Sequence, residues 1–164
     1  MARQATEHAT QYWLAKSEPA VYSIDDLRRD GATLWDGVRT YQARNFLRSM
    51  QVNDRVLFHH SSGDPSGVVG TAVVVGVAQP DPTQFDPRSD GFDEASKRDD
   101  PRWCAVTVRF ESRFVAPVTL QMLRADRALS GMRILQRGNR LSVTPVTAAE
   151  FARVLKLGGS SSQA

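Results

Sequence analysis

The segment from Val68 to Val77 constrains the fold most strongly, because nearly all of its residues are apolar or β-branched. A continuous run of this kind predicts a central strand that is covered on both faces. Gly70 and Gly76 interrupt the run. Glycine inside a strand indicates a bulge or the close approach of another backbone. We therefore expect a curled, barrel-like sheet around this segment.

Further strands are predicted on both sides of this run, and short helices near the two ends of the chain. Ser23 with Asp26, and Thr147 with Glu150, have the sequence pattern of helix N-termini. The predicted strands cover residues 12–15, 54–61 and 103–114, and the predicted helices begin at Ser23 and Thr40 and cover 119–125 and 147–157. Strands in the middle and helices at the ends predict an α+β fold.

The chain of 164 residues is long enough for one domain with a core of its own. We expect a mobile N-terminal tail over residues 1–10, an ordered domain over 11–157 and a flexible Gly/Ser-rich tail over 158–164. No apolar run reaches the roughly 20 residues of a membrane span, and the N-terminus lacks the layout of a secretion signal. These features predict a cytoplasmic protein without a membrane partner, with the nucleoid as one place of action.

Residues that carry catalysis or bind metals are sparse. His59 and His60 are neighbours on a predicted strand and point to opposite faces, so they cannot bind one metal together. Cys104, the single cysteine, lies on an apolar strand face, which favours a buried, inert thiol. No carboxylate pair is placed for acid–base chemistry, and no glycine-rich phosphate loop is present. We expect no catalytic residue, no metal and no cofactor.

Basic residues are unevenly distributed along the chain. The net charge is +3, yet residues 79–102 hold seven acidic and four basic residues, which leaves 17 basic and 11 acidic residues elsewhere. Residues 124–140 contain five arginines and one aspartate. Such clusters favour a polyanionic partner. Composition alone equally allows ordinary solvated arginines on a surface.

The segment from Trp35 to Phe46 combines aromatic, amide and guanidinium groups around one predicted helix. An apolar stripe on that helix comprises Ala43, Phe46, Leu47 and Met50, and the opposite face carries Tyr41, Asn45 and Arg48. No acidic residue between positions 37 and 53 neutralises the arginines. A flat ring, an amide and unpaired guanidinium groups suit a nucleotide, which offers a π-face, polar edges and a phosphate.

Several predicted strands end in polar residues. Lys16 and Ser17 precede a turn at Pro19, Ser61 follows another strand, and residues 137–140 form a turn that can present two guanidinium groups to a phosphate. Each feature alone is typical of an ordinary strand end. Together with the helix that follows Trp35, they point to one polar cleft.

Six motifs in this order resemble the EVE domain family over about residues 11–157. They read YWLAKSEP at 12–19, WDGVRTYQARNF at 35–46, HS at 60–61, PDPTQFDP at 80–87, PRW at 101–103 and RGNRLSVTPV at 137–146. Two positions depart from the common pattern, with Thr40 where asparagine is usual and His59 where tyrosine often stands. The resemblance implies a PUA-like fold: a strongly curved β-barrel decorated by short helices. It also implies a reader of a flipped, modified base, foremost a modified cytosine in DNA.

The resemblance assigns roles to residues whose chemistry permits them. Residues for the base are Ser17, Trp35, Tyr41, Asn45, His60, Ser61 and Phe85, and residues for the phosphates are Lys16, Arg39, Arg137, Asn139 and Arg140. Trp35 would stack on the base, and Phe85 would anchor residues 79–102 as a lid over the pocket. Two structural alternatives remain open at this point, a buried Trp35 in the core and an Arg39 that pairs with Asp36.

Other functions remain open on the sequence. The same pocket could serve an enzyme or an accessory factor of nucleotide or RNA modification, or a sensor that binds free nucleosides. The partner is expected to be DNA or RNA that carries a modified base. The sequence determines neither which base is bound nor the oligomeric state.

Overall fold

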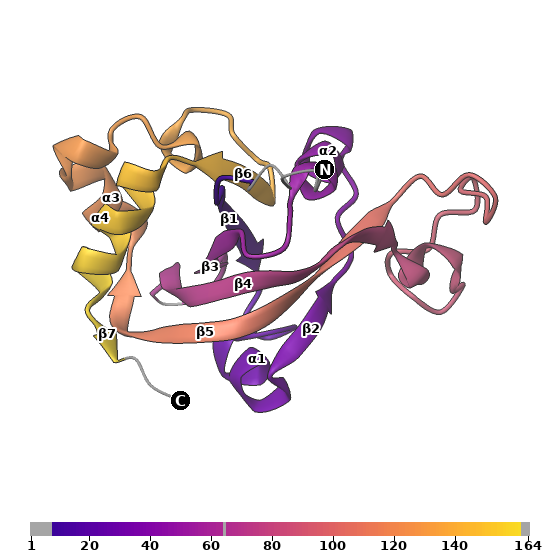
Figure 1. The fold of residues 1–164 in the computed structure, drawn as a ribbon, viewed down its shortest axis with the longest axis horizontal. Helices are drawn as coiled ribbons and strands as arrows, with labels where there is room; N and C mark the ends of the chain where they lie inside the picture. Colours follow the sequence, from indigo (N-terminus) through magenta and orange to yellow (C-terminus); the bar gives the residue numbers. More distant parts are fainter. Residues whose placement is uncertain (1–7, 64, 162–164) are drawn as a thin grey trace, which may run out of the picture.

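The computed structural model describes residues 8–63 and 65–161, and its seven strands form one sheet. The strands are β1 (Tyr12–Ser17), β2 (Ala32–Trp35), β3 (Arg55–His60), β4 (Gly67–Pro80), β5 (Cys104–Val118), β6 (Val143–Val146) and β7 (Ser160–Ser161). Their order is β2-β5-β4-β3-β1-β6, with β7 paired to β5 (Figure 1). Only β1 and β3 run parallel among these pairs. The two outer strands do not pair with each other in the described chain, so the α+β fold is confirmed while the predicted barrel is unconfirmed.

In the described residues, four helices accompany the sheet: α1 (Ile24–Asp30), α2 (Tyr41–Ser49), α3 (Leu120–Ala125) and α4 (Ala148–Gly158). The predicted caps are present. Both α1 and α4 begin with a capping box, and the Thr40 side chain accepts a hydrogen bond from the third backbone N–H group of α2. Short 3-10 turns cover Pro82–Phe85, Arg127–Leu129 and Arg133–Leu135. None of the described helices is long and apolar enough to cross a membrane.

Strand alternation divides the interior into two cores. Trp13 and Ala15 of β1 join the buried residues of α1 and α2 in the larger core. Leu14, between them, joins residues of α3 and α4 in the smaller core. Figure 1 accordingly shows α3 and α4 gathered at one end of the sheet and α1 and α2 elsewhere around it. The larger core lies behind the ends of β1 and β2, where the site described below is found.

The glycines of β4 act as the sequence predicts. A methyl group at Gly70 would overlap the backbone oxygen of Ser112 on β5. The pairing register between β4 and β5 shifts at both Gly70 and Gly76. One expectation needs correction, because β4 is buried only as far as Val74. Beyond that point Val75 and Val77 are 38% and 57% exposed, since the strand leaves the body of the sheet.

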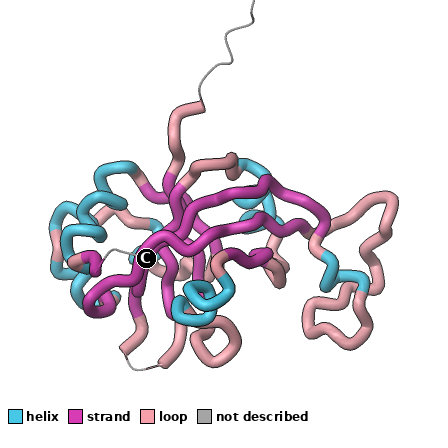
Figure 2. The backbone as a smooth tube through the Cα atoms, turned by 60° about the horizontal axis from the view of Figure 1, so that its bottom comes forward, coloured by secondary structure: helices cyan, strands magenta, loops and turns pink. Residues whose placement is uncertain are grey.

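The ends of the ordered domain also differ from expectation. Gly158 is the last residue of α4, and Ser160–Ser161 pair with β5 as β7, so the structure continues past residue 157. The remaining parts of the predicted tails, residues 1–7 and 162–164, lie outside the described residues. Residues 79–102 project from the sheet as an arm, which Figure 2 shows to one side of the body.

Candidate functional site

A cavity of about 260 Å³ lies where β1 and β2 end, and we call it the β1–β2 pocket. It is lined by Lys16, Ser17, Val21, Tyr22, Thr33, Leu34, Trp35 and Asp36. A turn after β1 forms one wall, because the N–H groups of Val21 and Tyr22 both donate to the backbone oxygen of Glu18. The Ser17 hydroxyl then donates to the Tyr22 backbone oxygen at 2.7 Å. Three predicted site residues, Lys16, Ser17 and Trp35, therefore meet here.

Trp35 belongs both to the core and to this pocket. Its side chain packs edge-on against Phe58 with ring centroids 5.3 Å apart, and only 9% of the residue is exposed. Trp35 is thus buried in the core, which is the alternative that the sequence left open, yet it also lines the cavity. A tryptophan so placed offers a ligand a rigid apolar wall.

Two charged side chains line the pocket without a hydrogen-bond partner among the other described residues. Burial lowers the pKa of Lys16. Partial desolvation, followed by the negative charge of Asp81, raises the pKa of Asp36, and Arg39 lowers it. Both shifts mean that the folded protein disfavours the charged forms of Lys16 and Asp36. A polar ligand that binds to these side chains can stabilise their charges.

A second cavity of about 420 Å³ lies beside the N-terminus of α2, and we call it the arginine cleft. Its lining comprises Thr40, Gln42, Arg133, Gln136, Arg137, Gly138, Asn139, Arg140 and Leu141. Within the described chain, the guanidinium groups of Arg137 and Arg140 have no hydrogen-bond or ion-pair partner. They are therefore free to bind an anion.

Asn139, a predicted phosphate ligand, shapes the turn of the arginine cleft. Its amide nitrogen donates to the Arg133 backbone oxygen, and its side-chain oxygen accepts from the Leu141 N–H at 3.0 Å. Gly138 supplies the positive φ of 80° that the same turn requires. Asn139 thus positions Arg137 and Arg140, and the second N–H of its amide remains available to a phosphate oxygen.

The two cavities are close together. Asp36 of the pocket and Thr40 of the cleft are four residues apart, which limits their Cα separation to about 14 Å. From the other side, the Lys16 N–H donates at 2.8 Å to the backbone oxygen of Ser142, the residue after Leu141. An aromatic pocket and an anion cleft therefore share one end of β1.

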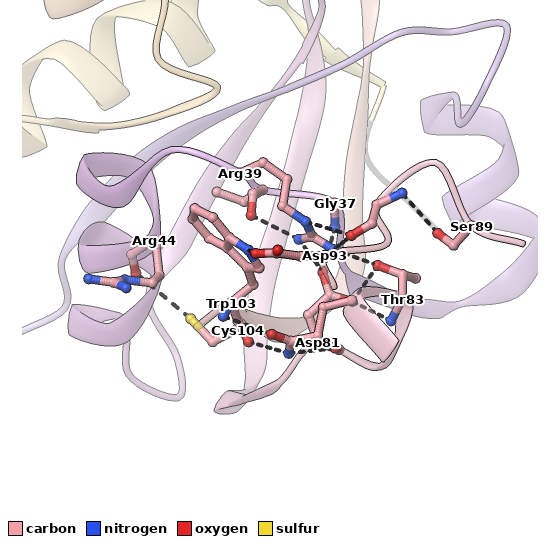
Figure 3. Close-up of polar contacts among 12 residues, drawn as sticks. Gly37, Arg39, Arg44, Asp81, Thr83, Ser89, Asp93, Trp103 and Cys104 are labelled. Atoms are coloured by element: carbon pink, nitrogen blue, oxygen red, sulfur yellow. Dashed lines mark hydrogen bonds and ion pairs between the residues drawn. The ribbon is translucent and has the colours of Figure 1, made fainter. Parts of the chain in front are cut away.

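Arg39, predicted to bind phosphate, instead forms an ion pair and hydrogen bonds within the protein (Figure 3). Its guanidinium forms a 2.8 Å ion pair with Asp81 and further hydrogen bonds to Thr83 and to the backbone oxygens of Val38 and Gly91. Burial raises the pKa of Asp81, but hydrogen bonds from Thr83, Arg39 and Gly37 outweigh it and lower that pKa overall. The structural alternative left open by the sequence, an Arg39 paired with a carboxylate, is therefore present, but the carboxylate is that of Asp81 and not of Asp36. All five N–H groups of Arg39 are used, four of them in hydrogen bonds to the arm and one in a hydrogen bond to Val38.

Tyr41 and Asn45 line neither cavity. Tyr41 is 54% exposed and stacks on Trp103 with ring centroids 5.2 Å apart, while the Arg44 guanidinium lies 4.7 Å from its ring. The Asn45 side-chain oxygen accepts a 3.2 Å hydrogen bond from Arg44. The outer face of α2 is therefore a separate surface, on which Tyr41 and Asn45 already interact with neighbouring side chains of the protein.

His60, Ser61 and Phe85 also do not line the β1–β2 pocket. The His60 Nε2 accepts the Ile24 N–H at 3.1 Å and so caps α1, and burial, with a smaller contribution from Arg113, lowers its pKa although Asp25 raises it. Ser61 is exposed, and its N–H donates to the Ser17 backbone oxygen. Phe85 packs beneath the Arg98 guanidinium at 4.7 Å within the arm. The predicted lid needs correction, because Phe85 lines a hollow of the arm and not this pocket.

Several residues that line the two cavities were not predicted from the sequence. They include Val21, Tyr22, Thr33 and Asp36 in the pocket, and Gln42, Arg133 and Gln136 in the cleft. A signal existed for two of them, since Tyr22 follows the turn at Pro19 and Asp36 follows Trp35 directly. In the described part of the chain, no group of three His, Cys, Asp or Glu side chains is placed to hold a metal ion.

Comparisons with known proteins show the family and the fold. The family model of the EVE domain matches residues 11–157. Thymocyte nuclear protein 1 of mouse is 39% identical over 92% of this chain and 75% of its own length. A crystal structure of a Pseudomonas syringae protein is 44% identical, with a TM-score of 0.87 over 89% of this chain and 98% of that chain. Human THYN1, solved in complex with DNA containing 5-methylcytosine, is 36% identical, with a TM-score of 0.86 over 92% of this chain and 98% of that chain.

These relatives correct the predicted location. The prediction of a cytoplasmic protein rested on the lack of a membrane segment and of a secretion signal. The similar mouse and human proteins are both called thymocyte nuclear protein 1, and their name states a nuclear protein. A nuclear protein shares the same lack of these two signals, so they cannot distinguish the compartments.

Proposed function

Because the chain belongs to the EVE domain family, we propose that it binds DNA and holds a flipped, modified cytosine in the β1–β2 pocket. The observation that carries this proposal is the short distance between that pocket and the arginine cleft. A nucleotide turned out of a duplex must place its base in one site while its backbone remains on another. The complex of human THYN1 with DNA containing 5-methylcytosine supports the choice of ligand.

The pocket suits a single pyrimidine. Its volume of about 260 Å³ is below the roughly 300 Å³ at which sites for drug-sized ligands begin. Trp35 and Leu34 provide apolar walls against the ring, and Val21, 76% exposed, provides apolar surface for a methyl group at its rim. Lys16 offers a charged donor to the ring's acceptors.

The arginine cleft suits the phosphates that flank the flipped base. Arg137 and Arg140 can each form paired hydrogen bonds to phosphate oxygens, and the N-terminus of α2 adds a favourable dipole. Such contacts position a nucleic acid without reading its sequence. The recognition of the modified base therefore falls to the pocket alone.

In this assignment the chain acts as a binding module. We also propose that the sheet is part of a PUA-like, strongly curved barrel, as the sequence predicts, because the register shifts between β4 and β5 favour curvature.

The proposal is tested by titrating the protein with two duplexes that differ only in one methyl group, 5-methylcytosine or cytosine at a central position. We expect tighter binding of the methylated duplex, and for both duplexes an affinity that falls steeply with salt, because phosphate contacts release counterions. The free nucleoside 5-methyl-2′-deoxycytidine serves as the control and should bind weakly with little salt dependence. Equal affinity for the two duplexes, or salt-independent binding, would contradict the proposal.

A further inference from the structure

We propose that Asp36 makes the β1–β2 pocket accept cytosine and reject thymine, by accepting a hydrogen bond from the exocyclic amino group that only cytosine carries. This inference rests on the proposed function and assigns a specificity-determining residue within it. It matters because thymine and 5-methylcytosine carry the same methyl group, so contacts with the methyl cannot separate them.

The hydrogen-bond inventory of the pocket leaves few groups for a ligand. The hydroxyl hydrogen of Ser17 goes to the Tyr22 backbone oxygen at 2.7 Å. The Tyr22 hydroxyl donates to Asp30 at 2.9 Å. The Thr33 side chain is hydrogen-bonded to that same Tyr22 hydroxyl and, because the tyrosine hydrogen is already used, must be its donor. The hydroxyl groups of Ser17, Tyr22 and Thr33 thus all donate their hydrogen bonds to other groups of the protein.

Two charged groups then dominate what the pocket can offer. Lys16 is a donor, and Asp36 is the one carboxylate among the described residues that line the pocket. Asp36 accepts no hydrogen bond from another described residue. Burial and the charge of Asp81 raise its pKa, while Arg39 and the backbone N–H of Asp36 itself lower it. Because a carboxylate also repels DNA, Asp36 serves binding only if a ligand donor meets it.

The pattern of one cationic donor and one anionic acceptor matches cytosine. Its amino group donates to an acceptor such as a carboxylate, and its ring nitrogen and carbonyl accept from a donor such as Lys16. Thymine presents a carbonyl oxygen where cytosine has the amino group. That oxygen would face the lone pairs of Asp36 and leave the carboxylate unpaired, an arrangement that sites built around a hydrogen bond reject strongly.

The test compares three duplexes with one central position opposite guanine, occupied by 5-methylcytosine, cytosine or thymine. A mismatched thymine is easier to flip, so a preference for 5-methylcytosine cannot arise from easier extrusion. The variant Asp36→Asn keeps the side-chain shape but can turn either an amino group or an oxygen toward the base. Glu18→Gln is the matched control, because it removes one carboxylate beside the pocket, from an exposed residue that does not line it.

We expect the wild-type protein and Glu18→Gln to prefer 5-methylcytosine over thymine by roughly tenfold to a hundredfold. Asp36→Asn should bring that ratio close to one while retaining the preference for 5-methylcytosine over cytosine. An unchanged ratio in Asp36→Asn, with thermal unfolding confirming a folded variant, would overturn the inference and leave the proposed function intact. A wild-type protein without preference for 5-methylcytosine over cytosine would instead refute the proposed function.

Discussion

His59 shows how one residue can set the pH dependence of the fold. It lies opposite Lys16 in the β1–β3 pairing, is 2% exposed, and neither ring nitrogen has a hydrogen-bond partner among the described residues. Burial, followed by the positive charges of Lys16 and His60, lowers the pKa of His59 to about 4. The imidazole is therefore neutral in the fold at pH 7, and its protonation opposes folding.

This depressed pKa predicts a loss of stability in acid. The unfolded chain takes up a proton at His59 as the pH falls below about 6.5, whereas the folded chain does so only near 4, so the free energy of unfolding decreases between these values. Between neutral pH and about pH 4.5, we expect the free energy of unfolding to fall by about 2–3 kcal/mol less in His59→Phe than in the wild type, because the variant has no imidazole to protonate. Urea unfolding of both proteins at neutral and acidic pH measures the difference. Parallel pH profiles would show that folding does not lower the pKa of His59.

At the scale of elements, the arm of residues 79–102 is fixed by its base. Arg39 reaches from the segment before α2 to Asp81, whose side chain is completely buried. The Gln84 side chain adds hydrogen bonds to the backbone of Trp103 at 2.8 and 3.1 Å. These contacts join the start of the arm to its end.

We predict that Arg39 and Arg137 have separable effects. Arg39→Ala leaves Asp81 buried without its cation and should lower the free energy of unfolding by roughly 3 kcal/mol, with little change in the salt dependence of DNA binding. Arg137→Ala should leave stability nearly unchanged and reduce the slope of log affinity against log salt by about one. Urea unfolding and salt titration of both variants provide the measurements. If a folded Arg39→Ala protein showed a reduced salt slope, Arg39 would bind phosphate and the prediction would be wrong.

Across the whole molecule, the sequence predicted the features that depend on neighbouring residues. The caps at Ser23 and Thr147 and the bulged strand β4 follow from local patterns. It did not predict the Arg39–Asp81 pair, whose members are 42 positions apart and are joined only by the fold. The family resemblance supplied residue roles, but it could not show that Tyr41 and Phe85 are paired elsewhere.

The position of the captured base tests the central claim most directly. A duplex with 5-iodocytosine at the modified position places iodine where the methyl group would lie, and ultraviolet light then joins that carbon to an adjacent aromatic side chain. Trypsin separates Tyr22, Trp35, Tyr41 and Trp103 into four peptides, because a lysine or arginine lies between each pair. The account predicts that mass spectrometry finds the crosslink on Tyr22 or Trp35 in the β1–β2 pocket. A crosslink on Tyr41 or Trp103 would contradict it and place the base on the outer face of α2.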